Sequence, residues 1–343
     1  MRISLVVLMT IALLFSVIAR SQENGVFRAT AEIESQSASE LDAGANLALL
    51  SLLKSMTLET EQTKLTPILN QGKSLLKQAI FLGVRDASSG SRQVVSYEFD
   101  AQALTQAIFA EGLGLVPADR ARPLLWWVVS DLNGDVRYLD ARRDFALVEG
   151  VKTLLDEYRL DFDLPLYDLT DTVTVSPDAL WQSQRVPLAR AMQRYQPQTQ
   201  RVIKWAELTD NRILLSVLSM EEGRLNTQLE ALYADTTEAV SALVELLVRR
   251  ARSDLAVTAD EADLPNIVID GLTNFQDYRR IMRALEANVF VESVRVIRLD
   301  GQSLTLGVES PVSRDQFKQI LQDALGLEYI EVNERGMRFG LGL

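Results

Sequence analysis

Cysteine and histidine are both absent from the 343 residues of the chain. Their absence excludes catalytic triads that depend on histidine, zinc sites with the usual His and Cys ligands, histidine-ligated haem, thiol redox chemistry and disulfide bonds. Any catalysis would have to use carboxylates, lysine, tyrosine or serine. The sequence therefore predicts no cofactor and no metal site of the common kinds.

Long basic runs are also absent, and the formal net charge is −12. The densest basic groups hold only two or three arginines, which is too few to neutralise many phosphates. The sequence therefore predicts no nucleic-acid partner. These groups are Arg142 with Arg143, Arg249 with Arg250 and Arg252, and Arg279 with Arg280 and Arg283.

The chain is too long for one ordinary core and suits two or three domains of about 100–150 residues each. Apolar residues make up 47% and charged residues 24%, a balance that is typical of globular proteins. Strand and helix patterns alternate along the sequence. We therefore predict an α/β and α+β protein made of tandem small domains.

The amino terminus has the pattern of a secretory signal peptide. Arg2 is followed by an apolar run over residues 3–18, and Ala19-Arg20-Ser21 then leads into polar chain. This arrangement predicts a signal peptide over residues 1–21, cleaved between Ser21 and Gln22 or, alternatively, after Ala19. A retained membrane anchor is the other interpretation, since the run approaches the length of a spanning helix. The preferred prediction is export to the periplasm, with no membrane span in the mature chain.

Residues 22–118 are predicted to form a β-α-α-β-α module. Apolar residues from Leu41 to Met56 make one helical stripe after a strand at residues 26–33. The remaining predicted elements are a helix at 66–81, a strand at 93–99 and a helix at 101–110.

Residues 119–255 are predicted to form a second, α/β domain. It opens with an apolar strand at 124–129, and Asn133-Gly134 predicts a hairpin to a strand at 136–139. The other predicted strands cover 200–207, 211–220 and 225–233, and the predicted helices cover 145–158, 186–195 and 237–252.

An acidic linker is predicted at residues 256–265, followed by a third domain at 266–343. The predicted elements of this domain follow the order β-α-β-β-α-β, which is the ferredoxin-like arrangement. Its strands are expected at 266–272, 289–299, 303–310 and 327–332, and its helices at 274–287 and 313–325.

The densest carboxylate group comprises Asp161, Asp163, Asp168 and Asp171. Alternation along a strand would place Asp161 and Asp163 on one face, where clustered carboxylates bind Mg²⁺ or Ca²⁺ or act as an acid/base pair. Because the chain has 47 acidic residues, some clustering arises by chance. A solvated strand end or helix cap is the favoured interpretation.

The four tryptophans offer a second possible site, a groove for a sugar or a peptide. Trp126 and Trp127 are adjacent and point to opposite faces of their strand. On a one-sided sheet only one of them would lie in the core, and the other would be covered by a helix or partner or remain exposed. Trp181 and Trp205 are the other two.

Three blocks of sequence resemble the DUF2066 family of exported proteobacterial proteins. They are residues 122–127, residues 164–171, and Leu188-Ala189-Arg190 with Arg194-Tyr195. The chain departs from the family at Tyr167, where an apolar residue resembling Met is expected, and at 201–205, which is less rich in glycine. More weakly, the layout of the first two domains is similar to TolB amino-terminal and flagellar T-ring accessory domains. Neither resemblance implies a catalytic residue.

The sequence favours a non-catalytic scaffold or adaptor of the bacterial envelope, with a protein partner and a binding site that no motif identifies. The alternative is a carboxylate-dependent hydrolase or an enzyme that binds Mg²⁺ or Ca²⁺, with Asp161, Asp163 and Asp168 as its catalytic candidates. These carboxylates need neither histidine nor cysteine for such chemistry.

Overall fold

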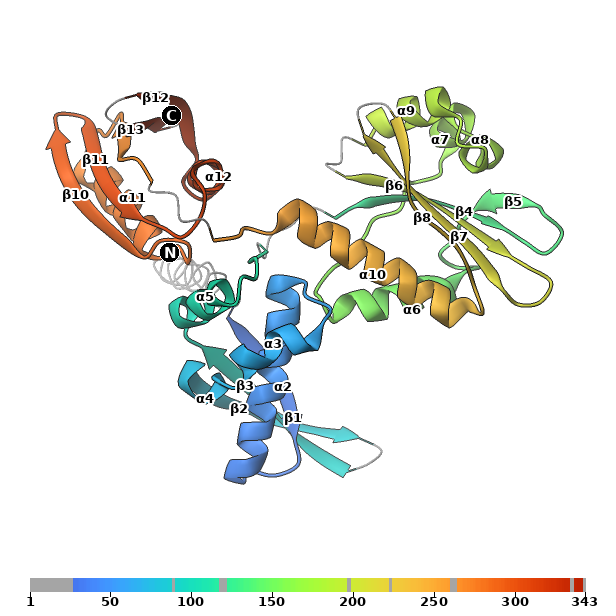
Figure 1. The fold of residues 1–343 in the computed structure, drawn as a ribbon, viewed down its shortest axis with the longest axis horizontal. Helices are drawn as coiled ribbons and strands as arrows, with labels where there is room; N and C mark the ends of the chain where they lie inside the picture. Colours follow the sequence, from blue (N-terminus) through green and yellow to red (C-terminus); the bar gives the residue numbers. More distant parts are fainter. Residues whose placement is uncertain are drawn as a thin grey trace, which may run out of the picture. The chain divides into compact units, whose positions relative to one another are not determined.

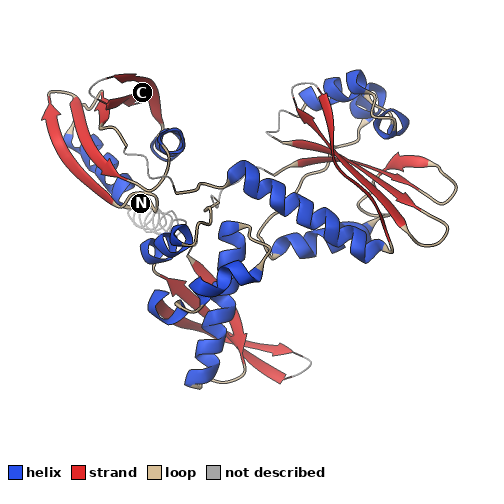
Figure 2. Cartoon of the chain, viewed as in Figure 1, coloured by secondary structure: helices blue, strands red, loops and turns tan. Residues whose placement is uncertain are grey.

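The computed structural model describes residues 27–87, 90–116, 122–195, 199–221, 224–259, 264–333 and 336–341. The predicted cleavage between Ser21 and Gln22 lies outside these ranges. The described residues form three β-sheets with helices packed on them, so the mixed α/β class with tandem sheet-containing domains is confirmed (Figures 1 and 2). They fall into two compact units. The first takes in the described residues of Met1–Leu53, Glu61–Val116 and Ala256–Leu343 and holds two sheets, and the second takes in those of Lys54–Thr60 and Pro117–Leu255.

The amino-terminal sheet is antiparallel, with strand order β1-β3-β2. Leu49 and Leu52 of the long helix α2 are fully buried, as the predicted apolar stripe requires. Its strands are β1 (Arg28–Ile33), β2 (Leu76–Ala87) and β3 (Gly90–Phe99), and the helices of this region are α2 (Ala38–Thr57), α3 (Gln62–Leu69), α4 (Gly72–Leu75) and α5 (Ala101–Ala110).

The predicted helix over residues 66–81 is correct only in its first part, which α3 and α4 cover, and is wrong from Leu76 onward. Helical structure ends at Leu75, and strand β2 begins at Leu76. The apolar residues of this stretch pair with β3 instead, with Ala79 opposite Tyr97 and Phe81 opposite Val95. Pairing with the strand that follows it in sequence has therefore overridden the local helical spacing.

The second unit contains a five-stranded sheet in the order β5-β4-β6-β7-β8. Strands β4 and β6 run parallel, and the other neighbours are antiparallel. The predicted hairpin after β4 is present, and Asp131 accepts hydrogen bonds from the N–H groups of Asn133 and Asp135 within its turn. The strands are β4 (Leu124–Ser130), β5 (Val136–Tyr138), β6 (Gln200–Glu207), β7 (Ile213–Glu221) and β8 (Arg224–Tyr233).

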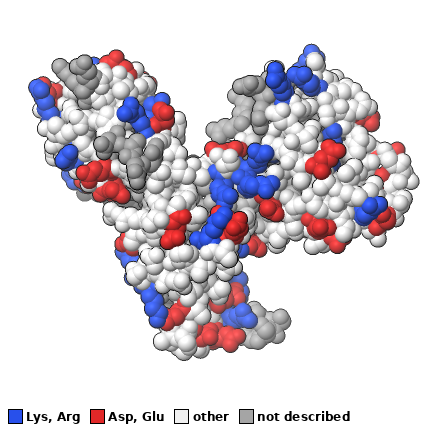
Figure 3. Space-filling view, in the orientation of Figure 1, with Lys and Arg blue, Asp and Glu red and all other residues white. Residues whose placement is uncertain are grey.

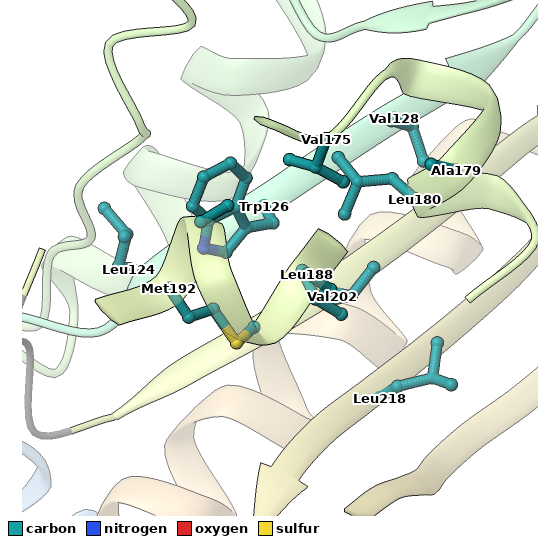
Figure 4. Close-up of a cluster of buried hydrophobic side chains, with 11 residues drawn as sticks. Leu124, Trp126, Val128, Val175, Ala179, Leu180, Leu188, Met192, Val202 and Leu218 are labelled. Carbon is teal, nitrogen blue, oxygen red and sulfur yellow. The ribbon is translucent and has the colours of Figure 1, made fainter. Parts of the chain in front are cut away.

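Helices cover both faces of this sheet (Figure 1). Trp126 packs against the layer of short helices, in a cluster with Leu180, Leu188 and Met192 (Figure 4). Trp127 points to the opposite face, where its ring lies 6.2 Å from that of Trp205. The short helices are α7 (Leu169–Thr174), α8 (Pro177–Trp181) and α9 (Arg185–Gln193), and the opposite layer is α6 (Phe145–Asp156) and α10 (Thr236–Leu255).

The interpretation of the tryptophans as a binding groove is therefore wrong for three of them. Trp126 and Trp127 are fully buried and Trp205 is 1% exposed, because the sheet is covered on two sides rather than one. Trp181 is partly buried and packs against the same cluster as Trp126. These rings build the core of the second unit.

The carboxy-terminal sheet contains the predicted β-α-β-β-α-β order and one strand more. The additional strand β13 pairs in parallel with β9, and β12 pairs with β13 at the edge of the sheet. The strand order is therefore β10-β11-β9-β13-β12. The elements are β9 (Ile267–Asp270), α11 (Phe275–Glu286), β10 (Ser293–Asp300), β11 (Ser303–Glu309), α12 (Arg314–Leu325), β12 (Leu327–Asn333) and β13 (Gly336–Leu341).

Among the helices that the structure describes, none combines the length and apolar character needed to cross a bilayer. Two residues in the first part of the predicted linker form isolated bridges. Val257 pairs with Leu115, and Ala259 pairs with Val312. This part of the linker is therefore paired within the first unit.

Candidate functional site

The densest polar network of the second unit centres on Asp171, whose side chain is 1% exposed. Its carboxylate accepts hydrogen bonds from the Tyr195 hydroxyl at 2.5 Å, from Arg194 Nη1 at 2.8 Å and from the Tyr167 N–H at 2.9 Å. A buried carboxylate is tolerated only when its charge is paired and its oxygens are hydrogen-bonded. Both conditions are met here.

Local chain geometry brings these partners together. Asp168 caps α7 by accepting the N–H of Asp171, which fixes the first turn of that helix. Arg194 follows the last turn of α9 and makes a two-pronged contact with Asp168, with both N–O distances at 2.7 Å. One guanidinium therefore joins α7 to α9 through two carboxylates.

Tyr167 connects this network to the sheet. Its hydroxyl accepts the N–H of Trp127 at 2.8 Å and donates to the Trp127 carbonyl at 3.3 Å. Its ring stacks on Tyr138 with centroids 4.3 Å apart, and its backbone has a φ of +50°, which is unusual for a bulky residue. Such a conformation persists only where the surroundings stabilise it.

The electrostatics of the network follow from these contacts. The hydrogen bonds that Arg194 donates hold the pKa of Asp168 well below its ordinary value, and donating to Asp168 and Asp171 raises the pKa of the arginine. Burial, with a smaller effect of the Asp171 charge, raises the pKa of Tyr138 to about 12, and burial also raises the pKa of Tyr167. At neutral pH the network therefore holds neutral phenols, an ionised Asp168 and a charged arginine.

The structure brings two of the three catalytic candidates to one arginine and pairs the third with another. Asp161 and Asp163 lie beside Arg122, at 3.1 and 3.6 Å, whereas Asp168 pairs with Arg194. The stretch holding Asp161 and Asp163 makes one isolated bridge, from Asp163 to Leu124, rather than a strand. Within the described ranges, no group of three or more acidic side chains is placed to hold a metal ion.

The Asp168 and Asp171 network is accordingly a brace rather than a reactive site. Arg194 and Tyr195, at the end of α9, bind both carboxylates at the start of α7, and the aromatic rings around the network pack edge to face on Trp126. The favoured interpretation of this part of the carboxylate group as a helix cap is correct for Asp168. Residues of the segments 122–127, 164–171 and 194–195 meet at this brace, which gives these segments a structural role.

The surface that sequence reasoning missed lies in the carboxy-terminal domain, between the start of α11, strand β10 and the turn that follows this strand. It is an open groove of about 450 Å³ with a mostly apolar lining. Phe275 is 70% exposed and stacks on Tyr278 with centroids 5.6 Å apart, and Leu299 is 59% exposed. The complete lining is Leu272, Thr273, Asn274, Phe275, Tyr278, Val296, Leu299 and Gly301.

A signal for this groove was present in the sequence. Phe275 and Tyr278 recur with Ile281, Met282 and Leu285 at the spacing of one apolar helix face, and Ile281 and Leu285 are buried. Phe275 lies at the first position of α11, and its ring is left 70% exposed. Periodicity identifies the apolar face of a helix but not how far the neighbouring sheet extends under it.

The described part of the chain is thus a three-sheet α/β protein with one internally satisfied carboxylate network and one open apolar groove. A search with models of known protein families finds no match to this chain, and comparison with curated protein sequences finds none either.

Proposed function

We propose that this chain is a non-catalytic adaptor of the bacterial envelope that binds a protein partner. The observation that carries the proposal is the groove at the start of α11, where a stacked Phe275 and Tyr278 remain exposed on a helix with a complete amino-terminal capping box. Exposed aromatic side chains held on a rigid element are typical of protein-binding surfaces.

The pairing of the carboxylates counts against the alternative of a carboxylate-dependent enzyme. A general acid and a nucleophile or base must face a shared substrate, with their carboxyl groups a few ångströms apart. Asp161 and Asp163 both flank one arginine, and Asp168 is held by another as a helix cap. No specific observation favours this second function.

The envelope location in this proposal comes from the sequence. The apolar segment before Ser21 is interpreted as a signal peptide, and the resemblance to the DUF2066 family has the same implication. Osmotic shock should release the mature chain. Its intact mass should match a chain that begins at Gln22, or at Arg20 under the alternative cleavage. A full-length chain that stays with the membranes would contradict this part of the proposal.

The adaptor function is tested by photocrosslinking in cells at native abundance. A photoreactive amino acid in place of Phe275 should give a discrete protein adduct, because a bound partner would cover this position. The matched control is Leu132, which is 59% exposed on a hairpin turn of the other unit and should give no adduct. Recovery of the chain alone from both positions would count against an adaptor.

A further inference from the structure

We propose that the groove at the start of α11, together with the arginine face of that helix, binds an acidic segment of a partner protein that carries a large apolar side chain. This inference rests on the proposed adaptor function and specifies the chemistry of its partner. Three features support it. They are an apolar groove, a row of arginines aligned with it, and nearby acidic side chains that are already occupied by other contacts.

The alignment follows from helical geometry. Residues four apart lie above one another on one face, so Phe275, Arg279 and Arg283 form a continuous row along α11. Arg280 lies beside this row, and all three arginines are exposed. They line a second, shallow hollow with Gln276, Ala284 and Ala287. An extended chain lying along the helix would therefore meet an apolar groove first and a cationic surface next.

The arginines retain the capacity to pair with a ligand. Within the described residues, neither Arg279 nor Arg283 makes an ion pair, and the interaction between Arg280 and Asp277 is only a longer-range attraction. Other arginines of the described residues, by contrast, form ion pairs with acidic side chains. Examples are Arg194, Arg137 and Arg338.

The acids closest to the groove are committed to other contacts. Asp277 accepts hydrogen bonds from the Thr273 N–H and hydroxyl and completes the capping box of α11. Asp300, beside the hairpin turn, pairs with Arg298 at 2.6 Å. Glu286 is the one acid on the helix that is left to oppose the three arginines, so the helix carries three positive charges against two negative ones.

Charge complementarity therefore selects an acidic occupant, although the whole chain carries a charge of −12. The face drawn in Figure 3 shows acidic and basic side chains in small interspersed groups. A second copy of this acidic chain would bring net repulsion, whereas a partner segment with carboxylates beside a Phe, Leu or Trp satisfies both the groove and the arginines. Three arginines are also too few to hold a nucleic acid strongly.

The experiment uses short random peptides displayed on phage and selected on the complete mature chain. The expected result is enrichment of sequences with an aromatic or aliphatic residue flanked by Asp or Glu. A synthetic peptide from this selection is then titrated against the protein, together with a version in which Gln replaces its acids. The acidic version should bind at least about tenfold more tightly, and its affinity should fall as salt rises.

Two variants locate the site. The double variant R279E and R283E should weaken the peptide at least about tenfold, and Phe275→Ser should weaken it comparably, while thermal unfolding stays unchanged because all three side chains are exposed. The matched control is R142E with R143E, which makes the same change in charge on exposed residues of the other unit and should leave binding intact.

Selection of basic or uncharged peptides would overturn the inference, as would equal loss of binding in the control variant. Binding to phosphatidylglycerol vesicles without any peptide enrichment would overturn it in favour of a lipid surface. The crosslinking experiment separates the two proposals: if an adduct still forms at Phe275 in cells while R279E and R283E leave it unchanged, the adaptor function stands and this inference fails, because the partner is not recognised through its acids.

Discussion

The guanidinium of Arg194 lies 2.8 Å from a carboxylate oxygen of Asp171, a side chain that is 1% exposed. The same arginine reaches Asp168 at the start of α7, so one cation neutralises two carboxylates and joins two helices. Charge pairing of this kind makes both partners necessary, since removing either leaves a buried group unsatisfied.

The first prediction concerns Asp171→Ala. This change leaves the Tyr195 hydroxyl and the Tyr167 N–H without their acceptor and removes the buried partner of Arg194. We expect the free energy of unfolding to fall by about 3 kcal/mol, measured by urea denaturation of the mature chain. The control Asp163→Ala removes a 58% exposed side chain and should cost less than about 1 kcal/mol. Equal effects of the two changes would show that Asp171 is not the centre of a brace.

The second prediction is a dependence of stability on acid. Arg194 lowers the pKa of Asp168 in the folded protein, whereas in the unfolded chain this carboxyl takes up a proton near its ordinary pKa of about 3.9. The contribution of the Asp168 and Arg194 pair to the stability of the fold is therefore complete above that pH. It is lost as the pH falls toward the lower folded-state pKa of Asp168.

Asp168→Asn tests this dependence, because asparagine still caps the helix but does not titrate. The variant should melt at a lower temperature than the wild type at neutral pH, and the difference should shrink as the pH falls below about 4. Thermal unfolding followed by circular dichroism across this range measures it. A difference that stays constant from neutral to acid pH would mean that the ion pair does not contribute.

Elements with strong local signals were predicted well from the sequence. The Asn133-Gly134 hairpin and the helices after Asp100 and Asn274 all depend on turn or capping residues that act within a few positions, and each is present. The stretch 76–81 failed because its structure depends on β3, which lies about a dozen residues away, rather than on its own spacing. Strand β13 was missed although Met337 and Phe339 alternate with the exposed Arg338.

The site depends even more on long-range arrangement. Spacing grouped four aspartates, but Asp161 and Asp168 pair with different arginines, and Arg194 lies 26 residues from Asp168 along the chain. A single sequence shows which residues are charged. It does not show which residue of opposite charge the fold will place beside each of them. The exposure of Phe275 likewise depends on which neighbours the fold brings beside it.

A third prediction follows from the two-sided burial of the second sheet. Three of the four tryptophans, Trp126, Trp127 and Trp205, are at most 1% exposed, and Trp181 is only partly exposed. Acrylamide should therefore quench the fluorescence of the native protein weakly, and urea unfolding should raise the quenching constant several-fold. Strong quenching of the native state would mean that one face of this sheet is open.

The last prediction concerns two glycines of the carboxy-terminal domain. Gly336 has a φ of +134°, and a Cβ there would lie 1.8 Å from the carbonyl oxygen of Asn266, a backbone atom that cannot move aside without displacing β9. Gly301, with a φ of +59°, faces open space in the turn between β10 and β11. Both positions favour glycine by conformation, but only Gly336 is also blocked by contact.

Gly301→Ala should therefore cost about 1 kcal/mol, the ordinary penalty for a left-handed backbone. Gly336→Ala should cost clearly more, at least about 2 kcal/mol, because it adds a clash to the strain and pushes β13 away from β9. Hydrogen exchange of the β9 and β13 amides provides the decisive measurement, since faster exchange there in Gly336→Ala, and not in Gly301→Ala, locates the damage at the parallel pair. Equal losses of stability with unchanged exchange would place the extra strand elsewhere in the sheet.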